Sequence, residues 1–235
     1  MVDGESVIYV DSELENLLGF DRPVNWAEHP TIASPFLEPG KNVVDLSSTR
    51  SKTRSYAAGA AAARRRLVSF EDFTWPLAPA RQGPPIDLRG VPATPDSLDH
   101  ITTLVDPSRK LAFVTAVNPA RQYLLGYIFR SDEYPWIQQW MSYGANGWLQ
   151  RGLEFATQPF DVPRRETVTT GALFDTPIFR WLPAKSKITT RFVMFYTKTP
   201  AGMSKIDDVR LEGGRLIIQD RAAGVEITLP ASLPL

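Results

Sequence analysis

The stretch Leu111-Ala-Phe-Val-Thr-Ala-Val117, followed by Asn118-Pro-Ala-Arg and then Tyr123-Leu-Leu-Gly-Tyr-Ile-Phe129, decides the fold class. Both outer runs are rich in β-branched and aromatic residues, which favour strands. The Asn-Pro pair between them marks a turn. The stretch therefore predicts two antiparallel strands joined by a short connection.

Three further runs in the second half of the chain carry the same signal. They cover residues 187–196, residues 215–219 behind Gly213-Gly214, and residues 225–229 behind Gly224. Glycines before such a run are typical of hairpin turns. Several of these runs are apolar at both alternating positions, whereas a strand with one solvated face would alternate. We therefore predict a mainly β protein made of packed antiparallel sheets in a large sandwich.

Helical signals are weak along the chain. Its 20 prolines stand between short apolar runs, and a proline inside a helix costs about 3 kcal/mol. The best helix candidate covers residues 57–67. Residues 75–95 are rich in proline and predict an extended loop over a surface. Because no internal repeat and no linker is evident, residues 1–235 are predicted to form a single β-sandwich domain.

The charges of the chain balance, with 26 Lys and Arg against 26 Asp and Glu. Bulk electrostatic binding to nucleic acid or to an anionic membrane needs a basic surface, so neither partner is expected. No run reaches the roughly 18 apolar residues of a membrane span, and the first residues do not resemble a signal peptide. We expect a soluble, cytoplasmic protein, with a periplasmic or secreted one as the alternative if a further segment precedes this sequence.

Several chemistries lack the residues that they need. The chain has no cysteine, which excludes disulfides, thiolate catalysis and Cys-based zinc sites. Its two histidines, His29 and His100, make a multi-histidine metal centre improbable. The sequence holds no glycine-rich nucleotide loop, no Gly-x-Ser-x-Gly elbow and no His-Glu-x-x-His motif. We therefore expect neither a cofactor nor a metal.

His29 lies in a proline-rich segment, residues 22–37, with Trp26 and Glu28 beside it in sequence. Such a rigid loop can hold an imidazole in one orientation. Because the pKa of an ordinary histidine is about 6.5, the side chain suits proton transfer near neutrality. The alternative is a histidine with a purely structural role.

Glu154 stands inside an apolar stretch, between Leu153 and Phe155. A strand there would bury the carboxylate at least in part. Burial raises the pKa of a carboxyl group and makes it a better proton acceptor once it is ionised. The alternative is an ion pair of Glu154 with Arg151 or Arg164 at the rim of a sheet, and the residues alone leave both readings open.

Three aromatic residues precede Glu154: Trp136, Trp140 and Tyr143. An exposed ring beside polar groups can bind a pyranose, because one face of the sugar is apolar and its rim carries hydroxyls. The alternative is that these rings fill the core.

The two segments, in this order, resemble the galactose mutarotase-like superfamily, which includes the aldose 1-epimerases. The resemblance is carried by Leu153-Glu154-Phe-Ala-Thr-Gln-Pro-Phe, by Asn25-Trp-Ala-Glu-His29-Pro-Thr-Ile, and by a returning strand within residues 182–196. It extends from about residue 23 to residue 196. It implies a large antiparallel β-supersandwich with a sugar-binding cleft.

The chain departs from the family pattern in three ways. Pro30 follows His29 where the family has an aromatic residue. The family's second histidine and its sugar-binding aspartate have only Asp96, Asp99 and His100 as candidates here. The family carries a set of strands upstream of its acid loop, and this chain has only a short segment there. The resemblance therefore predicts a truncated or C-terminal portion, with a supersandwich that is incomplete at the N-terminus.

The resemblance implies an aldose 1-epimerase, which interconverts the anomers of an aldose without a cofactor. In this interpretation Glu154 takes the proton of the anomeric hydroxyl and His29 donates a proton to the ring oxygen. The expected ligand is a small sugar or another carbohydrate. The residues expected to bind it are Trp140, Trp136, Gln158 and Arg130.

Two alternatives remain open at this point. Supersandwich domains also serve as non-catalytic carbohydrate-binding or structural modules, since a fold does not fix a function. A lyase acting on uronic-acid polymers would need a basic groove, which would be made of Arg50, Lys52, Arg54 and Arg64 to Arg66. The identity of the sugar and the oligomeric state do not follow from the sequence.

Overall fold

The structure, a computed structural model, describes residues 2–55 and 60–235. The predicted hairpin lies in a five-stranded antiparallel sheet with the order β1 (Val7–Glu15), β19 (Lys187–Lys198), β12 (Tyr123–Arg130), β11 (Leu111–Asn118) and β5 (Val43–Leu46). Leu111 lies opposite Arg130, and Asn118 lies opposite Tyr123. The prediction of two antiparallel strands is therefore confirmed.

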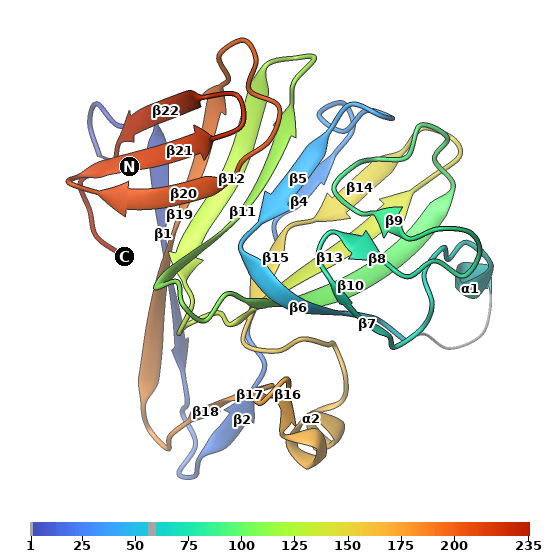
Figure 1. Cartoon of the computed structure of the whole chain (residues 1–235). Helices are drawn as coiled ribbons and strands as arrows, with labels where there is room; N and C mark the ends of the chain where they lie inside the picture. The colour runs from blue at the N-terminus through green and yellow to red at the C-terminus, as the bar shows by residue number, and fades with distance from the viewer. Residues whose placement is uncertain (1, 56–59) are drawn as a thin grey trace.

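A second antiparallel sheet of eight strands lies beside the first (Figure 1). Its main path is β3 (Ala27–Glu28), β15 (Glu154–Ala156), β13 (Trp136–Tyr143), β10 (Ser97–Val105), β6 (Ser48–Thr53) and β7 (Asp72–Thr74). Two further strands, β14 (Leu149–Gly152) and β4 (Thr31–Ala33), extend it from β13.

A third sheet, of three strands, is formed by β20 (Asp208–Glu212), β21 (Arg215–Asp220) and β22 (Val225–Pro230). Gly213 and Gly214, with φ of 57° and 74°, join β20 to β21 in a two-residue turn. Such a turn requires a left-handed backbone that glycine adopts without strain. The hairpin predicted from these two glycines is confirmed.

The remaining elements are short. The two-stranded pairs are β2 (Arg22–Val24) with β18 (Arg180–Leu182), β16 (Ala172–Leu173) with β17 (Thr176–Pro177), and β8 (Leu77–Ala78) with β9 (Ile86–Asp87). The helices are α1 (Ala60–Ala63) and α2 (Arg164–Thr170). Figure 1 places α2 with β2, β16, β17 and β18 below the large sheets.

Two apolar clusters order these sheets into three layers. One cluster fills the space between the five-stranded and the eight-stranded sheet, and includes Val114, Phe129, Ile137 and Phe155. The other packs the opposite face of the five-stranded sheet against β20–β22. The central sheet is thus covered on both faces, which explains why its strands are apolar at successive positions.

Two local expectations need correction. The helix expected over residues 57–67 is the single turn α1 in the described part, and residues 56–59 lie outside it. The proline-rich residues 75–95 form turns and bends around the β8–β9 pair rather than one extended loop. The helix α2 was not predicted, because its seven residues are mostly polar and show no apolar periodicity.

Candidate functional site

Glu154 and His29 are brought together by the pairing of β15 with β3. Phe155 lies opposite Glu28 in this pairing, and the Leu153 amide donates to the Pro30 carbonyl at 2.8 Å. The Phe155 ring points into the core, where it stacks on Phe129. Because successive side chains of a strand point to opposite faces, Glu154 lies on the outer face of the sheet.

The two predicted proton-transfer groups are in direct contact. Nε2 of His29 lies 3.2 Å from Oε1 of Glu154. The His29 side chain is 58% exposed and the Glu154 side chain 3%, so the imidazole faces solvent while the carboxylate lies beneath it. Nδ1 of His29 is 3.2 Å from the Thr31 hydroxyl. Thr31 thereby helps to hold the ring with Nε2 toward the carboxylate.

Gly152 leaves the space that the carboxylate occupies. A Cβ atom at this position would lie 2.3 Å from Oε1 of Glu154. No real Cβ contact is that short, so a side chain at residue 152 would displace the carboxylate. This position was not singled out in the sequence, because a lone glycine at the end of a strand carries no signal for what it approaches.

The environment of Glu154 brings the pKa of its carboxyl group near neutral pH. The pKa of Glu154 is raised to about 7. Burial is the main cause and the charge of Asp161 adds to it, while the charges of His29 and Arg54 act in the opposite direction. A general base is most effective when its pKa lies near the working pH. Glu154 therefore has the protonation behaviour that the sequence interpretation asks of a base.

Arg54, His100 and Asp161 surround this pair. Nη1 of Arg54 lies 3.0 Å from Nδ1 of His100 and donates to the Asp161 carboxylate at 3.1 Å. Nη2 of Arg54 donates to the Asp161 carbonyl at 2.9 Å. We call Glu154, His29, Arg54, His100 and Asp161 the Glu154 site.

The arginine determines the tautomer of His100. Arginine only donates hydrogen bonds, so Nδ1 of His100 must accept, and the ring proton is on Nε2. Burial, followed by the charge of Arg54, lowers the pKa of His100 to about 3. His100 is therefore a neutral hydrogen-bond donor at physiological pH, and it cannot serve as the acid.

Two of the residues expected to bind sugar lie near the Glu154 site. Trp140 is half-buried on β13, directly across from His100. Gln158 is buried, and its side-chain oxygen accepts a hydrogen bond from Thr157 at 3.1 Å. The carbonyl of Gln158 also accepts from the Gln138 amide at 3.0 Å.

The structure does not bring the other two into the Glu154 site. Trp136 has no exposed surface, and its indole N–H donates to the Pro177 carbonyl at 3.1 Å, so the ring cannot stack on a ligand. Arg130 ends β12 in the other large sheet, where its guanidinium is paired with Asp132 and Glu133. Both residues were chosen for their type and their place along the chain. Neither property reports that Trp136, on the same face of the sheet as Glu154, is fully buried, or that Arg130 lies in the other large sheet.

The alternative ion pairs of Glu154 are also excluded. Arg151 lies fully buried on the opposite face of the sheet, where it donates to Gln139 at 2.8 Å. Arg164 is exposed on α2 and has no ion pair with Glu154. Glu154 has His29 as its partner instead.

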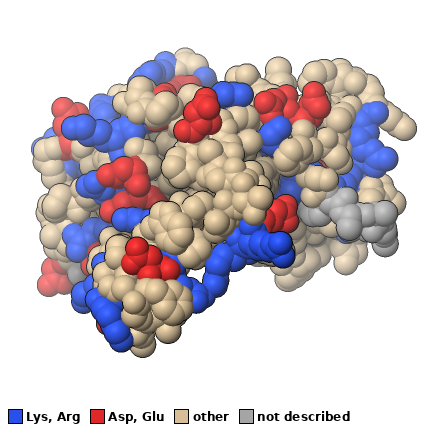
Figure 2. Space-filling model, turned by 90° about the horizontal axis from the view of Figure 1, so that it is seen from below, with Lys and Arg blue, Asp and Glu red and all other residues tan. Residues whose placement is uncertain are grey.

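The basic residues considered for a lyase groove are mostly neutralised by carboxylates. The ion pairs are Arg50 and Lys52 with Asp72, Arg64 with Asp96, and Arg66 with Asp99. Among these basic residues Arg54 alone belongs to the Glu154 site, and it is paired with Asp161. Figure 2 shows basic and acidic side chains interspersed over one face of the molecule, without a continuous basic stripe.

The candidates for the family's second histidine and its aspartate do not lie together; these are Asp96, Asp99 and His100. His100 joins the Glu154 site, whereas Asp99 is buried against Arg66 and Asp96 is exposed beside Arg64. In the described part of the chain no group of three or more Asp, Glu or His side chains is arranged to hold a metal ion. No helix within residues 2–55 and 60–235 is long and apolar enough to cross a membrane.

Sequence comparison gives no relatives, since no protein-family model and no curated protein matches the chain. The fold, however, is similar to solved structures. A Klebsiella pneumoniae protein to which aldose 1-epimerase activity is attributed aligns with 85% of this chain and 45% of its own length, at a TM-score of 0.59 and 14% identity.

Two other solved structures agree with this result. The galactose mutarotase-like protein of Clostridium acetobutylicum aligns with 81% of this chain and 52% of its own length (TM-score 0.52, 13% identity). The galactose mutarotase related enzyme of Lactobacillus acidophilus aligns with 85% of this chain and 60% of its own length (TM-score 0.52, 14% identity). The chain thus has a galactose mutarotase-like fold, as the resemblance predicted, and spans about half the length of these proteins.

Proposed function

We propose that the chain is a carbohydrate-active protein of the aldose 1-epimerase type, which interconverts the α and β anomers of an aldose. The observation that carries the proposal is the contact between the exposed imidazole of His29 and the buried carboxylate of Glu154, 3.2 Å apart. The fold likeness to proteins named for this chemistry supports it.

The reaction needs one base and one acid, close together. Glu154, as carboxylate, takes the proton of the anomeric hydroxyl, and His29, as imidazolium, donates a proton to the ring oxygen. The bond between C1 and the ring oxygen breaks to give an open-chain aldehyde, and rotation about the C1–C2 bond presents its other face. The ring then closes as His29 takes back the proton of the attacking hydroxyl and Glu154 returns its proton to the aldehyde oxygen. Both oxygens are bonded to the same carbon, so two adjacent side chains can reach them together. Proton transfer of this kind is worth about 10²–10⁴-fold in rate.

The other members of the Glu154 site, and two residues near it, have supporting roles in this proposal. Arg54 donates to Asp161 and to His100, and with them presents a fixed set of polar atoms beside the reacting pair. Trp140, half-buried across from His100, offers an aromatic surface to the apolar face of a sugar. Gln158 lies buried next to them and contributes amide groups that suit hydroxyls.

The decisive experiment measures the interconversion of glucose and galactose anomers by NMR saturation transfer. Acceleration by the wild-type chain and its loss in Glu154→Gln are expected. Glu133→Gln is the matched control, because it changes a carboxyl group whose pKa burial also raises, away from the Glu154 site. Buffer concentration must be low and constant, because buffer acids and bases catalyse the same reaction.

The main alternative is a non-catalytic carbohydrate-binding module. It predicts sugar-dependent shifts in NMR spectra of the folded chain with no change in the rate of interconversion. Equal rates for the wild type, Glu154→Gln and buffer alone would exclude the epimerase proposal.

A further inference from the structure

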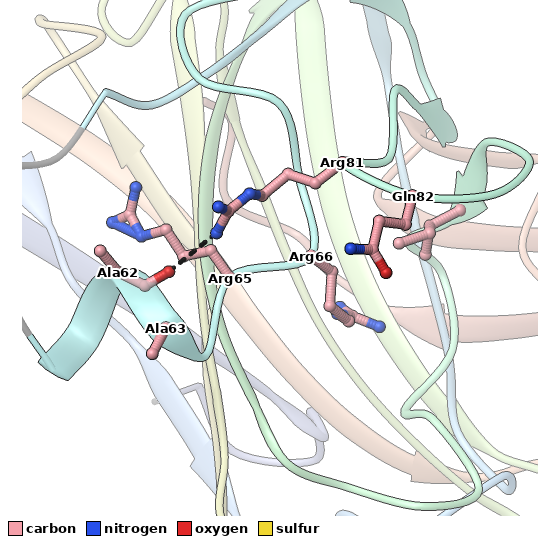
Figure 3. A pocket seen from close by; sticks show the side chains of 7 residues that line it. Ala62, Ala63, Arg65, Arg66, Arg81 and Gln82 are labelled. Atoms are coloured by element: carbon pink, nitrogen blue, oxygen red, sulfur yellow. Dashed lines mark hydrogen bonds between the residues drawn. The ribbon is translucent and has the colours of Figure 1, made fainter.

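A polar cavity of about 580 Å³ lies between α1 and the β8–β9 connection (Figure 3). This volume is within the roughly 300–1,000 Å³ typical of small-molecule sites. The residues that line it are Ala62, Ala63, Arg65, Arg66, Arg81, Gln82 and Ile86. None of them belongs to the Glu154 site.

The lining is rich in arginine. Among the described residues it contains three guanidinium groups and one amide and no acidic residue, although Asp99 is paired with one of the three, Arg66. Arg66 is fixed by Asp99, whose side chain is 1% exposed: Nε of Arg66 donates to Oδ2 at 2.6 Å, and the Arg66 backbone amide donates to Oδ1 at 3.0 Å. Within the described residues, Nη1 and Nη2 of Arg66 have no hydrogen-bond partner. The aspartate therefore orients this guanidinium and leaves its outer two nitrogens available.

Arg81 and Gln82 approach from the other side. Figure 3 shows the Arg81 side chain extending toward α1, where Nη1 donates to the Ala62 carbonyl at 3.0 Å. An arginine has five N–H donors, and those of Arg81 outside this bond have no partner in the described part of the chain. The Gln82 amide is exposed and likewise has no partner there.

The cavity and the Glu154 site are on opposite faces of β10. Asp99, which holds Arg66, and His100, which contacts Arg54, are adjacent in this strand. Adjacent side chains of a strand point to opposite faces of the sheet. A ligand in the cavity would therefore not be the sugar bound at Glu154.

We infer that this cavity binds a phosphate group carried by a small organic molecule. Guanidinium forks bind phosphate oxygens in pairs, and these charge-assisted hydrogen bonds are about twice as strong as neutral ones. Ala62, Ala63 and Ile86 provide an apolar wall for the organic part. The inference does not depend on the proposed epimerase activity.

Calorimetry with three probes tests this inference: phenyl phosphate, inorganic phosphate and phenol. Saturable binding is expected for phenyl phosphate, weaker binding for inorganic phosphate, and none for phenol. Affinity should fall as sodium chloride is raised, because the attraction is ionic. Absence of saturable phosphate binding at low salt would overturn the inference, as would binding of phenol as tight as that of phenyl phosphate.

Arginine-to-glutamine variants test whether the phosphate binds in this cavity. Arg81→Gln, at an exposed position, and Arg65→Gln are each expected to weaken phenyl phosphate binding about tenfold or more. Arg164→Gln removes the same charge from exposed α2 and is expected to leave the affinity unchanged, as is Glu154→Gln. An equal loss in Arg164→Gln and Arg81→Gln, with both variants folded by circular dichroism, would show a non-specific charge effect and contradict the inference. Loss of anomer interconversion in Glu154→Gln tests the proposed function separately.

Discussion

An alanine at position 152 would bring its Cβ to within 2.3 Å of Oε1 of Glu154. Small misplacements of a catalytic group can cost about 10²-fold in rate. Gly152→Ala is therefore expected to slow anomer interconversion about 10- to 100-fold. Gly19→Ala is the matched control, because nothing lies within 4 Å of the Cβ that it would add. Activity of Gly152→Ala within twofold of the wild type would contradict the geometric argument.

The same carboxylate should weaken the fold at alkaline pH. The folded-state pKa of Glu154 is about 7, above the 4.5 of an ordinary glutamate, so the folded chain binds this proton more tightly than the unfolded chain. The free energy of unfolding then falls as pH rises from about 4.5 to 7, and the loss is complete above pH 7. At about 1.4 kcal/mol per pKa unit the loss is at most about 3 kcal/mol.

Glu154→Gln removes this titration. The variant should be more stable than the wild type at pH 8, by about 1–3 kcal/mol, and the difference should shrink toward zero near pH 4. Urea unfolding at the two pH values measures it. The same stability difference at both pH values would mean that the carboxylate is not the group responsible.

The sequence predicted Glu154 and His29 as the candidate acid–base pair, but not the residues around them. Glu154 and His29 were identified because each is a titratable group in an apolar or rigid segment. Arg54 and Asp161 meet although 107 positions separate them, and no local pattern reports such a contact. The structure does not bring Trp136 and Arg130 into the Glu154 site, because residue type alone tells neither that a ring is fully buried nor in which sheet a side chain lies.

At the scale of elements, the two-residue strand β3 determines where His29 lies. It is short, so side-chain contacts must help to hold it. The Tyr134 hydroxyl lies 3.0 Å from Oε1 of Glu28 and 2.6 Å from the Thr190 hydroxyl on β19. This network ties the segment that carries His29 to the five-stranded sheet.

Tyr134→Phe is expected to lower the rate of anomer interconversion several-fold and to destabilise the fold by about 1–2 kcal/mol, because buried polar atoms lose a partner. Tyr127→Phe is the control, since Tyr127 is buried in the same core and its hydroxyl has no hydrogen bond in the described part of the chain. Rates and urea midpoints of both variants should be compared. Equal effects of the two substitutions would argue against a positioning role for Tyr134.

The long strands were predictable and the short ones were not. Residues 111–129, 187–196 and 215–229 were predicted as strands because they combine β-branched and aromatic residues with turn signals. Strands of two or three residues, such as β2, β3 and β16, are too short to show a period. Tertiary pairing, which the local sequence does not encode, forms them.

At the scale of the whole molecule, the five-stranded central sheet is buried between two different layers. The eight-stranded sheet packs on one face, and β20–β22 pack on the other. The second cover is small and is built around Val209, Leu216 and Ile218, each with no exposed surface. Its loss would leave one large apolar face of the central sheet in water.

Ile218→Ala is expected to destabilise the fold by about 2–5 kcal/mol, because it opens a cavity between β21 and the central sheet. Ile217→Ala, at a half-buried position on the other face of β21, should cost clearly less. Hydrogen exchange should show the loss of protection first in the amides of β20–β22, the smallest layer. Equal destabilisation by both variants would contradict this layering.

The order of the strands along the chain has a consequence for biosynthesis. The strands of the central sheet, including β19, leave the ribosome before β20–β22. At about 5–20 residues per second, the face that these last strands cover stays bare for a few seconds, exposing Phe113, Leu124 and Ile128. A nascent chain halted after residue 198 should therefore recruit chaperones and aggregate, although its candidate catalytic residues have all been synthesised.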